Sequence, residues 1–140
     1  MRKTAVFSIL LVLAGLVSLG GECGSTRSRH SSMVYNNTVK VYRSNKTVIP
    51  LFFTANDTIS GNFTTRGEKP VDLFVLDTFN FRRSTHDSAH SVFARTNTGN
   101  ADIFFSSANA DTFKFEFVNH DPDSLRSVTL YLNRVYWETE

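Results

Sequence analysis

The strongest constraint on the fold is a strict two-residue alternation of apolar and polar side chains in the C-terminal third of the chain. In residues 112–117, three phenylalanines share one parity, while Thr, Lys and Glu share the other. Residues 128–133 alternate in the same way. Successive side chains of a β-strand point to opposite faces, so each segment predicts a strand with one buried and one solvated face. Between them, residues 119–124 consist of turn formers and predict a hairpin or a connection between two sheets.

Six further segments have the composition of short strands. Turn-forming residues at 56–57, 66–70 and 98–100 separate several of them, and no segment sustains an amphipathic helical stripe. The best helix candidate, residues 84–90, is short and polar. The predicted strands span residues 39–42, 48–54, 58–65, 71–76, 92–96 and 102–106. We therefore predict an all-β fold, an antiparallel β-sandwich of about seven to eight strands, with a barrel as the alternative.

The N-terminus has the pattern of an export signal. Arg2 and Lys3 precede an apolar run from Ala5 to Leu19, and residues 20–22 end that run with two glycines and a glutamate. About 20 apolar residues are needed to cross a bilayer. A shorter run with a cationic start and a small-residue exit predicts a secretory signal, with cleavage after Gly20. We therefore expect a secreted or cell-surface protein.

The single cysteine, Cys23, follows directly after this leader. In that position it resembles the lipid-bearing cysteine of a bacterial or archaeal lipoprotein, which makes Cys23 a lipidation candidate and residues 1–23 the leader. The family pattern has a small residue before the cysteine, whereas Glu22 stands there in this chain. The alternative is a cysteine that is removed or left free. Membrane contact is expected only through a lipid on Cys23, and one cysteine excludes an intrachain disulfide.

We divide the remaining chain into a tether and one domain. Residues 24–32 contain no apolar side chain, so residues 24–35 predict a flexible Ser/Arg-rich tether and residues 36–140 a single β-sandwich domain. The formal net charge of +2 falls to zero once Arg2 and Lys3 are removed, and rises to +1 if Glu22 is lost as well. This balance gives no reason to expect nucleic-acid binding.

Four Asn-x-Thr sequons lie before residue 65, at Asn36, Asn45, Asn56 and Asn62. This tripeptide is the acceptor for N-linked sugar, so the four asparagines are glycosylation candidates. In a host that attaches sugar to asparagine, the partner contacts would lie on the part of the domain without sequons. In a host without this modification the pattern has no meaning.

One histidine pair resembles a zinc-hydrolase signature. His86 and His90 flank Asp87 with the i, i+4 spacing of His-Glu-x-x-His. A third zinc ligand would have to be His120, Asp121 or Asp123. The aspartate is one methylene shorter than the usual glutamate, and no amphipathic helix surrounds the pair. We interpret this segment as a polar loop. We expect no catalytic residues, no bound metal and no cofactor.

Adjacent aromatic residues predict exposed rings. Neighbours in a strand alternate, so one member of Phe52–Phe53 and one of Phe104–Phe105 must point away from the core. In the last strand, Val135 and Trp137 fall on the opposite parity to residues 128–132, which predicts a β-bulge near residues 133–134. Alternatively, Tyr136 faces inward and leaves Val135 and Trp137 exposed as a contact patch. Tyr136 and Trp137 are our candidate contact residues.

Four segments carry a resemblance to a known domain: residues 59–63, 69–77, 111–119 and 127–132. Their order resembles the β-sandwich of the emp24/GOLD type and its prokaryotic look-alikes. The chain lacks the coiled coil, membrane span, cytosolic tail and paired cysteines of the p24 trafficking proteins. The resemblance therefore implies a sandwich that binds other molecules, and it does not imply cargo transport.

The favoured function is a non-enzymatic binding module for a protein or glycan partner or for a second copy of itself. One alternative is a structural subunit of a surface filament or coat that assembles by strand exchange, with residues 38–42 as the donor. The other is a zinc-dependent hydrolase that uses His86 and His90.

Overall fold

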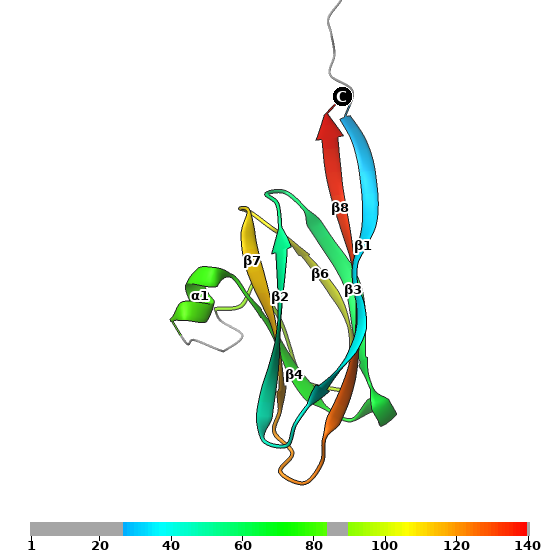
Figure 1. The fold of residues 1–140 in the computed structure, drawn as a ribbon, viewed down its shortest axis with the longest axis vertical. Helices are drawn as coiled ribbons and strands as arrows, with labels where there is room; N and C mark the ends of the chain where they lie inside the picture. The colour runs from blue at the N-terminus through cyan, green and yellow to red at the C-terminus, as the bar shows by residue number, and fades with distance from the viewer. Residues whose placement is uncertain (1–26, 84–89, 140) are drawn as a thin grey trace, which may run out of the picture.

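The computed structural model describes residues 27–83 and 90–139 and confirms an all-β sandwich of two antiparallel sheets (Figure 1). Sheet A has the strand order β1-β8-β3-β6, and sheet B has the order β2-β7-β4-β5. Two short helical segments, η1 (Arg66–Glu68) and α1 (Thr78–Arg82), lie in the connections. The strands are β1 (Arg27–Val41), β2 (Asn45–Phe53), β3 (Thr58–Thr65), β4 (Val71–Leu76), β5 (Phe93–Thr98), β6 (Asn100–Ser106), β7 (Asp111–Asn119) and β8 (Arg126–Thr139).

The alternating phenylalanines of β7 form the centre of the core, as the sequence pattern predicts. Phe115 and Phe117 are fully buried, and Phe113 is nearly so. Their rings pack against inward-facing rings of sheet A and of β2: the centroid of Phe63 lies 5.3 Å from that of Phe117, and that of Phe53 lies 5.9 Å from that of Phe113. Tilted and edge-on contacts of this kind suit the quadrupoles of aromatic rings.

Both adjacent phenylalanine pairs also divide as predicted. Phe53 and Phe105 are buried, whereas Phe52 is 61% exposed on the outer face of sheet B and Phe104 is 67% exposed on the outer face of sheet A. The predicted turn over residues 119–124 connects β7 of sheet B to β8 of sheet A, so it crosses between the sheets.

The expected flexible tether is wrong from Arg27 onward. Residues 27–35 belong to β1, which pairs with β8 along its length, and their side chains alternate in exposure. The polar composition of this segment predicts disorder. The segment nevertheless forms a strand, because its backbone hydrogen-bonds to the long partner strand β8, and these hydrogen bonds outweigh the effect of composition. Residues 24–26 lie outside the described part of the chain.

The β-bulge predicted near residues 133–134 is also wrong. β8 pairs with β3 in an uninterrupted register from Val128 to Val135. The irregularity lies instead in β1, where Met33 and Tyr35 face consecutive residues of β8 and leave Val34 as the extra residue. The alternative is therefore confirmed for Trp137, which is 59% exposed, but not for Val135, which is half-buried.

The outer face of sheet B is partly covered, which the sequence did not indicate. Phe74 and Leu76 have the outward parity of β4 and do not join the central core, yet Phe74 is 7% exposed and Leu76 is fully buried. α1 contacts both β4 and β7, and the ring of Phe81 lies 5.8 Å from Nζ of Lys114. The segment that follows β4 therefore packs on this face. Within residues 27–83 and 90–139, no helix is long and apolar enough to cross a bilayer.

Candidate binding surfaces

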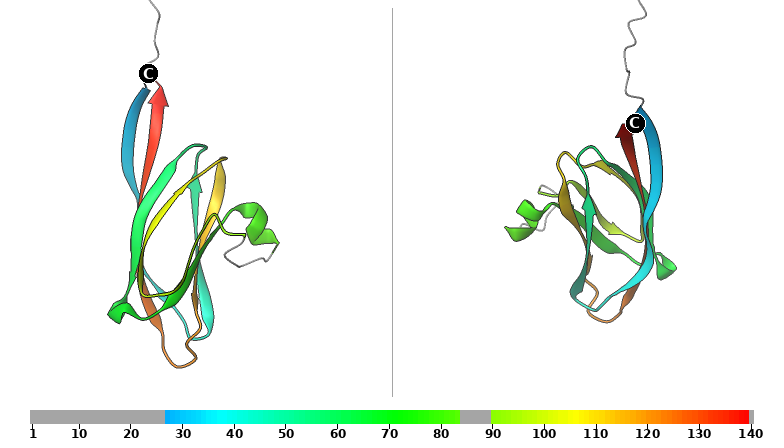
Figure 2. Two further views of the ribbon diagram at one scale, coloured as in Figure 1. Left: turned by 180° about the vertical axis from the view of Figure 1, so that it is seen from behind. Right: turned by 45° about the horizontal axis from the view of Figure 1, so that its top comes forward.

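The two longest strands extend beyond the sandwich as a two-stranded ribbon, which we call the arm. It comprises residues 27–30 of β1 and 136–139 of β8, because β3 stops pairing with β8 at Val135. Figures 1 and 2 show the arm projecting from one end of the molecule. An isolated pair of strands is only marginally stable in water. The arm therefore depends on its attachment to sheet A and on contacts at its base.

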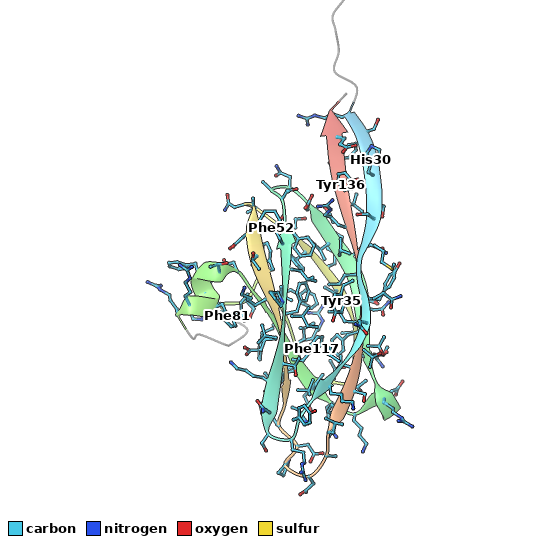
Figure 3. The ribbon with its side chains drawn as sticks, viewed as in Figure 1. His30, Tyr35, Phe52, Phe81, Phe117 and Tyr136 are labelled. Atoms are coloured by element: carbon cyan, nitrogen blue, oxygen red, sulfur yellow. The ribbon has the colours of Figure 1, made fainter. Side chains whose placement is uncertain are left out.

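A stack of side chains connects the arm to the sandwich. The rings of His30 and Tyr136 (Figure 3) stack with centroids 5.5 Å apart. The Arg134 guanidinium lies 4.4 Å from the Tyr136 centroid. Nη1 of Arg134 is 3.7 Å from Oδ2 of Asp57, a carboxylate that is 1% exposed and accepts the Thr54 N–H at 2.7 Å. This stack holds Tyr136 against the sandwich.

An open cleft of about 270 Å³ lies between the arm and the β2–β3 turn. The exposed Trp137 and the half-buried Tyr136 form its arm side, so both predicted contact residues belong to one concave surface. The remaining lining residues are Arg27, Thr54, Ala55, Asn56 and Asp57.

The second surface is the outer face of sheet A. Four cross-strand rows, each with one residue from β1, β8, β3 and β6, place sixteen side chains on this face, and none of them is buried. Eight carry a hydroxyl and four a carboxamide, whereas no Lys, Arg, His or Glu occurs among them. We call this surface the neutral face. Its rows are Ser31–Val135–Thr58–Ser106, Met33–Asn133–Ser60–Phe104, Asn36–Tyr131–Asn62–Asp102 and Thr38–Thr129–Thr64–Asn100.

A partly buried set of hydrogen bonds attaches α1 to β7. The Asp111 carboxylate accepts hydrogen bonds from the Thr78 hydroxyl at 2.6 Å, the Thr78 N–H at 2.9 Å and the Thr112 N–H at 2.7 Å. Partial burial raises the pKa of Asp111. The hydrogen bonds from Thr78 and Thr112 together lower that pKa by more than burial raises it, so the net shift is downward. Asp111 is therefore held in its charged form and anchors the start of α1.

A second carboxylate organises the connection between the sheets at the opposite end from the arm. The Asp121 carboxylate accepts hydrogen bonds from the N–H of Asp123, from the hydroxyl and N–H of Ser124, and from the buried Arg126 guanidinium. The Asp123 N–H, followed by the Ser124 hydroxyl and Arg126, lowers the pKa of Asp121 well below its usual range. The negative charge of Asp121 is therefore stabilised by residues of its own turn and by Arg126, which gives it a structural role.

The proposed zinc ligands are only partly placed. His86 and Asp87 lie outside the described residues, and His90 is exposed. His120, one of the candidate third ligands, has its Nε2 2.7 Å from Oδ2 of Asp72. Among the residues that the structure describes, no group of three or more His, Cys, Asp or Glu side chains could hold a metal ion.

All four sequon asparagines are exposed, but they belong to different surfaces. Asn36 and Asn62 flank Tyr131 on the neutral face. Asn56 lines the cleft at the base of the arm, and Asn45 begins β2. Cys23, the lipidation candidate, precedes the described residues.

Sequence reasoning identified the aromatic residues of the arm but missed both surfaces as assemblies. The neutral face combines residues from four strands, and only the strand order brings Asn36, Tyr131, Asn62 and Asp102 into one row. The available signal was the run of polar residues on the outward parity of β3, where Thr58, Ser60, Asn62 and Thr64 alternate with the apolar Ile59 and Phe63 and with Gly61.

No protein-family model and no curated protein sequence matches this chain. Among solved structures it is similar to PliG, a periplasmic inhibitor of g-type lysozyme from Aeromonas hydrophila, at 8% identity and a TM-score of 0.39, covering 82% of this chain and 89% of that one. It is also similar to CBM86, a low-affinity xylan-binding module from Roseburia intestinalis, at 10% identity and a TM-score of 0.39, over 82% and 96% of the two chains. Identity and TM-score are both too low for these names to indicate what this chain binds.

Proposed function

We propose that this protein is an exported, non-enzymatic binding module that contacts its partner through the arm and the cleft at its base. The observation that carries the proposal is the projecting ribbon, which presents an exposed Trp137 beside a concave surface. Large aromatic side chains dominate the energetics of protein interfaces, because each buries a large area with few rotatable bonds.

The arrangement of the arm supports a contact role. Stacking with His30 and Arg134 fixes Tyr136 in place before any partner arrives. A surface that is already ordered loses little conformational entropy on binding, which favours affinity. The cleft is lined by residues of the β2–β3 turn on one side and by the aromatic residues Tyr136 and Trp137 on the other. Such a mixture suits a protein surface with an apolar anchor point.

Site-specific photocrosslinking tests this proposal. A photoreactive phenylalanine analogue replaces Trp137 in one variant and Phe52 in a second, and both are expressed in the native host. Phe52 is 61% exposed on the outer face of sheet B, so it matches Trp137 at 59% in exposure. We expect a discrete covalent adduct from position 137 and none from position 52. No adduct from position 137, or equal adducts from both positions, would overturn the proposal.

A second candidate function is assembly by strand exchange, which one observation favours. β1 is an edge strand at the beginning of the domain, and its residues 38–41 pair with β8 residues 126–129. The β1 of another copy could make the same hydrogen bonds. In the described structure this donor segment pairs within its own chain.

A disulfide trap distinguishes the two arrangements. The hydroxyls of Thr38 and Thr129 are 2.8 Å apart across the β1–β8 pair, so cysteines at both positions would bond within a self-paired chain. In a Cys23→Ser background, we expect the Thr38→Cys/Thr129→Cys variant to oxidise to an internally bridged monomer. A ladder of disulfide-linked multimers on a non-reducing gel would instead establish strand exchange.

Three finer assignments also belong to the proposal. These are the lipid on Cys23, the sugars on the sequon asparagines and the resemblance to the emp24/GOLD sandwich. A sugar on Asn56 would occupy the cleft, so the proposed contact requires Asn56 to be unmodified. The intact mass of the native protein tests the first two directly, because an acyl chain and a glycan each add a characteristic increment. A mature mass that includes residues 1–20 would overturn export by a cleaved signal.

A further inference from the structure

The neutral face differs in composition from the rest of the molecule. Ionisable Asp, Glu, Lys and Arg make up 20% of the whole chain, but Asp102 is the only one of them among the sixteen side chains of this face. Basic residues lie just beyond it, with Lys40 in the next row at one end and Arg29 beside Trp137 at the other. The absence of positive charge is therefore confined to the four rows.

The polar groups of this face match a ligand rich in hydroxyls. Each Ser, Thr or Tyr hydroxyl donates and accepts hydrogen bonds, and each Asn amide offers two donors and an acceptor. A sugar hydroxyl needs both kinds of partner at close spacing. Anionic ligands such as nucleic acid instead require Lys or Arg, of which these rows contain none.

Aromatic and apolar side chains lie among these polar groups. Phe104 is 67% exposed and Met33 is 61% exposed, at opposite ends of one row. In the next row, Tyr131 exchanges hydrogen bonds with the Asn133 amide, at 2.9 Å and 3.2 Å. This pairing places the Asn133 amide against the Tyr131 hydroxyl. A sugar ring has a C–H face that packs on an aromatic ring and a rim of hydroxyls that reaches the neighbouring amides.

The shape of the face suits an extended ligand. Four rows two residues apart span about 20 Å along the strands, and four strands span about 14 Å across. Between β3 and β6 the surface forms an open depression of about 280 Å³, in which Asn62, Thr64, Asn100 and Asp102 contribute from the neutral face. Phe104 lies in the row beside Asn62 and Asp102. The depression therefore places polar side chains next to an exposed ring.

We propose that the neutral face, with Asn36 and Asn62 free of N-linked sugar, binds a neutral carbohydrate chain. Phe104 and Tyr131 are the stacking residues, and Asn62, Asn133 and Asp102 are the hydrogen-bonding residues. This inference rests on the proposed function in one respect only, namely that the protein acts by contact. The site itself is separate from the arm.

Calorimetric titration of the unglycosylated protein tests the proposal. The probes are the neutral hexasaccharides of β-1,4-glucose, β-1,4-xylose, β-1,3-glucose and β-1,4-mannose, with hexa-galacturonate as a charged ligand of equal length. We expect at least one neutral hexasaccharide to bind more tightly than hexa-galacturonate. Amide shifts in the NMR spectrum should map to β8, β3 and β6. Absence of binding by all four neutral probes, or tighter binding of hexa-galacturonate, would overturn the proposal.

Matched variants locate the site. Phe104→Ala removes an exposed ring from the neutral face, and Phe52→Ala removes an equally exposed ring from the other sheet. We expect Phe104→Ala to weaken binding at least tenfold, Tyr131→Ala to weaken it several-fold, and Phe52→Ala to leave it unchanged. Equal effects of the two alanine variants would contradict the assignment. A photocrosslink from position 137 without any carbohydrate binding would leave the proposed function standing and remove this inference alone.

Discussion

The outer faces of the two sheets differ more than their inner faces do. Inward-facing residues of both sheets are Phe, Leu, Ile and Val, which pack into a single core. On the outer face of sheet B, however, Glu116, Phe74 and Leu76 are buried, and Nζ of Lys46 lies 3.0 Å from Oε2 of Glu116. The outer face of sheet A has no buried side chain among its four rows.

The difference shows that the outer face of a sheet can either stabilise the fold or remain open to solvent. The segment containing α1 packs on the side of sheet B where the outward residues of β4 are apolar, so burial on this face contributes to stability. No described segment of the chain covers the hydroxyl and amide side chains on the outer face of sheet A, so packing on that face contributes little to stability. A surface that is rich in polar groups, yet unused by the fold, is available for a ligand.

The largest expected effect comes from Leu76→Ala. Leu76 is fully buried at the end of β4, on the outer face of sheet B. Its truncation should therefore lower the free energy of unfolding by about 2–5 kcal/mol. Phe104→Ala on the neutral face should change it by about 0.5 kcal/mol or less, because that ring is exposed. Urea denaturation of both variants measures the difference. Equal losses would contradict the contrast between the faces.

Gly61→Ala should have the next largest effect. A Cβ at Gly61 would overlap the carbonyl oxygen of Tyr131, so β3 and β8 could not keep their present distance. We expect a loss of about 1–3 kcal/mol, together with weaker carbohydrate binding, because the neutral face is built across this strand pair. Gly67→Ala is the control, since Gly67 has a φ of +71° in open space and should cost about 1 kcal/mol without affecting binding.

Acidification should release the cover of sheet B. The pKa of Asp111 is lowered in the folded protein, so its stabilising effect is present above the unfolded pKa near 3.8 and disappears as the pH falls through the folded value. Asp121 contributes in the same direction. We expect the wild type to lose more stability than Asp111→Asn between about pH 5 and about pH 2, as measured by thermal unfolding. Parallel curves for the two proteins would exclude this role of Asp111.

The smallest expected effect is that of Thr129→Val. The Thr129 hydroxyl contacts that of Thr38 on an exposed part of the neutral face. Exposed substitutions of this kind usually change stability by about 0.5 kcal/mol or less. A change above about 1 kcal/mol would mean that the hydroxyls of the neutral face stabilise the fold, and the contrast with sheet B would be weaker.

Much of the strand layout could be predicted, because period-two alternation reports which side of a strand is buried. Residues 58–65 and 71–76 were predicted with the bounds of β3 and β4. Phe52–Phe53 and Phe104–Phe105 divided as expected, since neighbouring side chains cannot share a face. β1 was recognised only at its C-terminal end, because Arg27 to Tyr35 contains few apolar residues, and its pairing with β8 depends on a strand about 100 residues away.

The candidate sites were less predictable than the strands. Tyr136 and Trp137 were identified as contact residues by their chemistry, but the bulge expected beside them proved to lie at Val34 on the partner strand. The burial of Phe74 and Leu76 on an outer face was not predicted at all. The misplaced bulge and the missed cover have one cause: alternation assigns a parity to each residue, but it does not say what covers that side.

The amino-acid sequence alone determined that this chain forms strands and which parity of most strands is apolar, because that information is contained in neighbouring residues. Only the tertiary structure decided the strand order, the arm and the cover over sheet B. These features depend on contacts between residues far apart in the chain. Asn36, Tyr131, Asn62 and Asp102 form one row because β1, β8, β3 and β6 are neighbours in sheet A, an adjacency that no local pattern encodes.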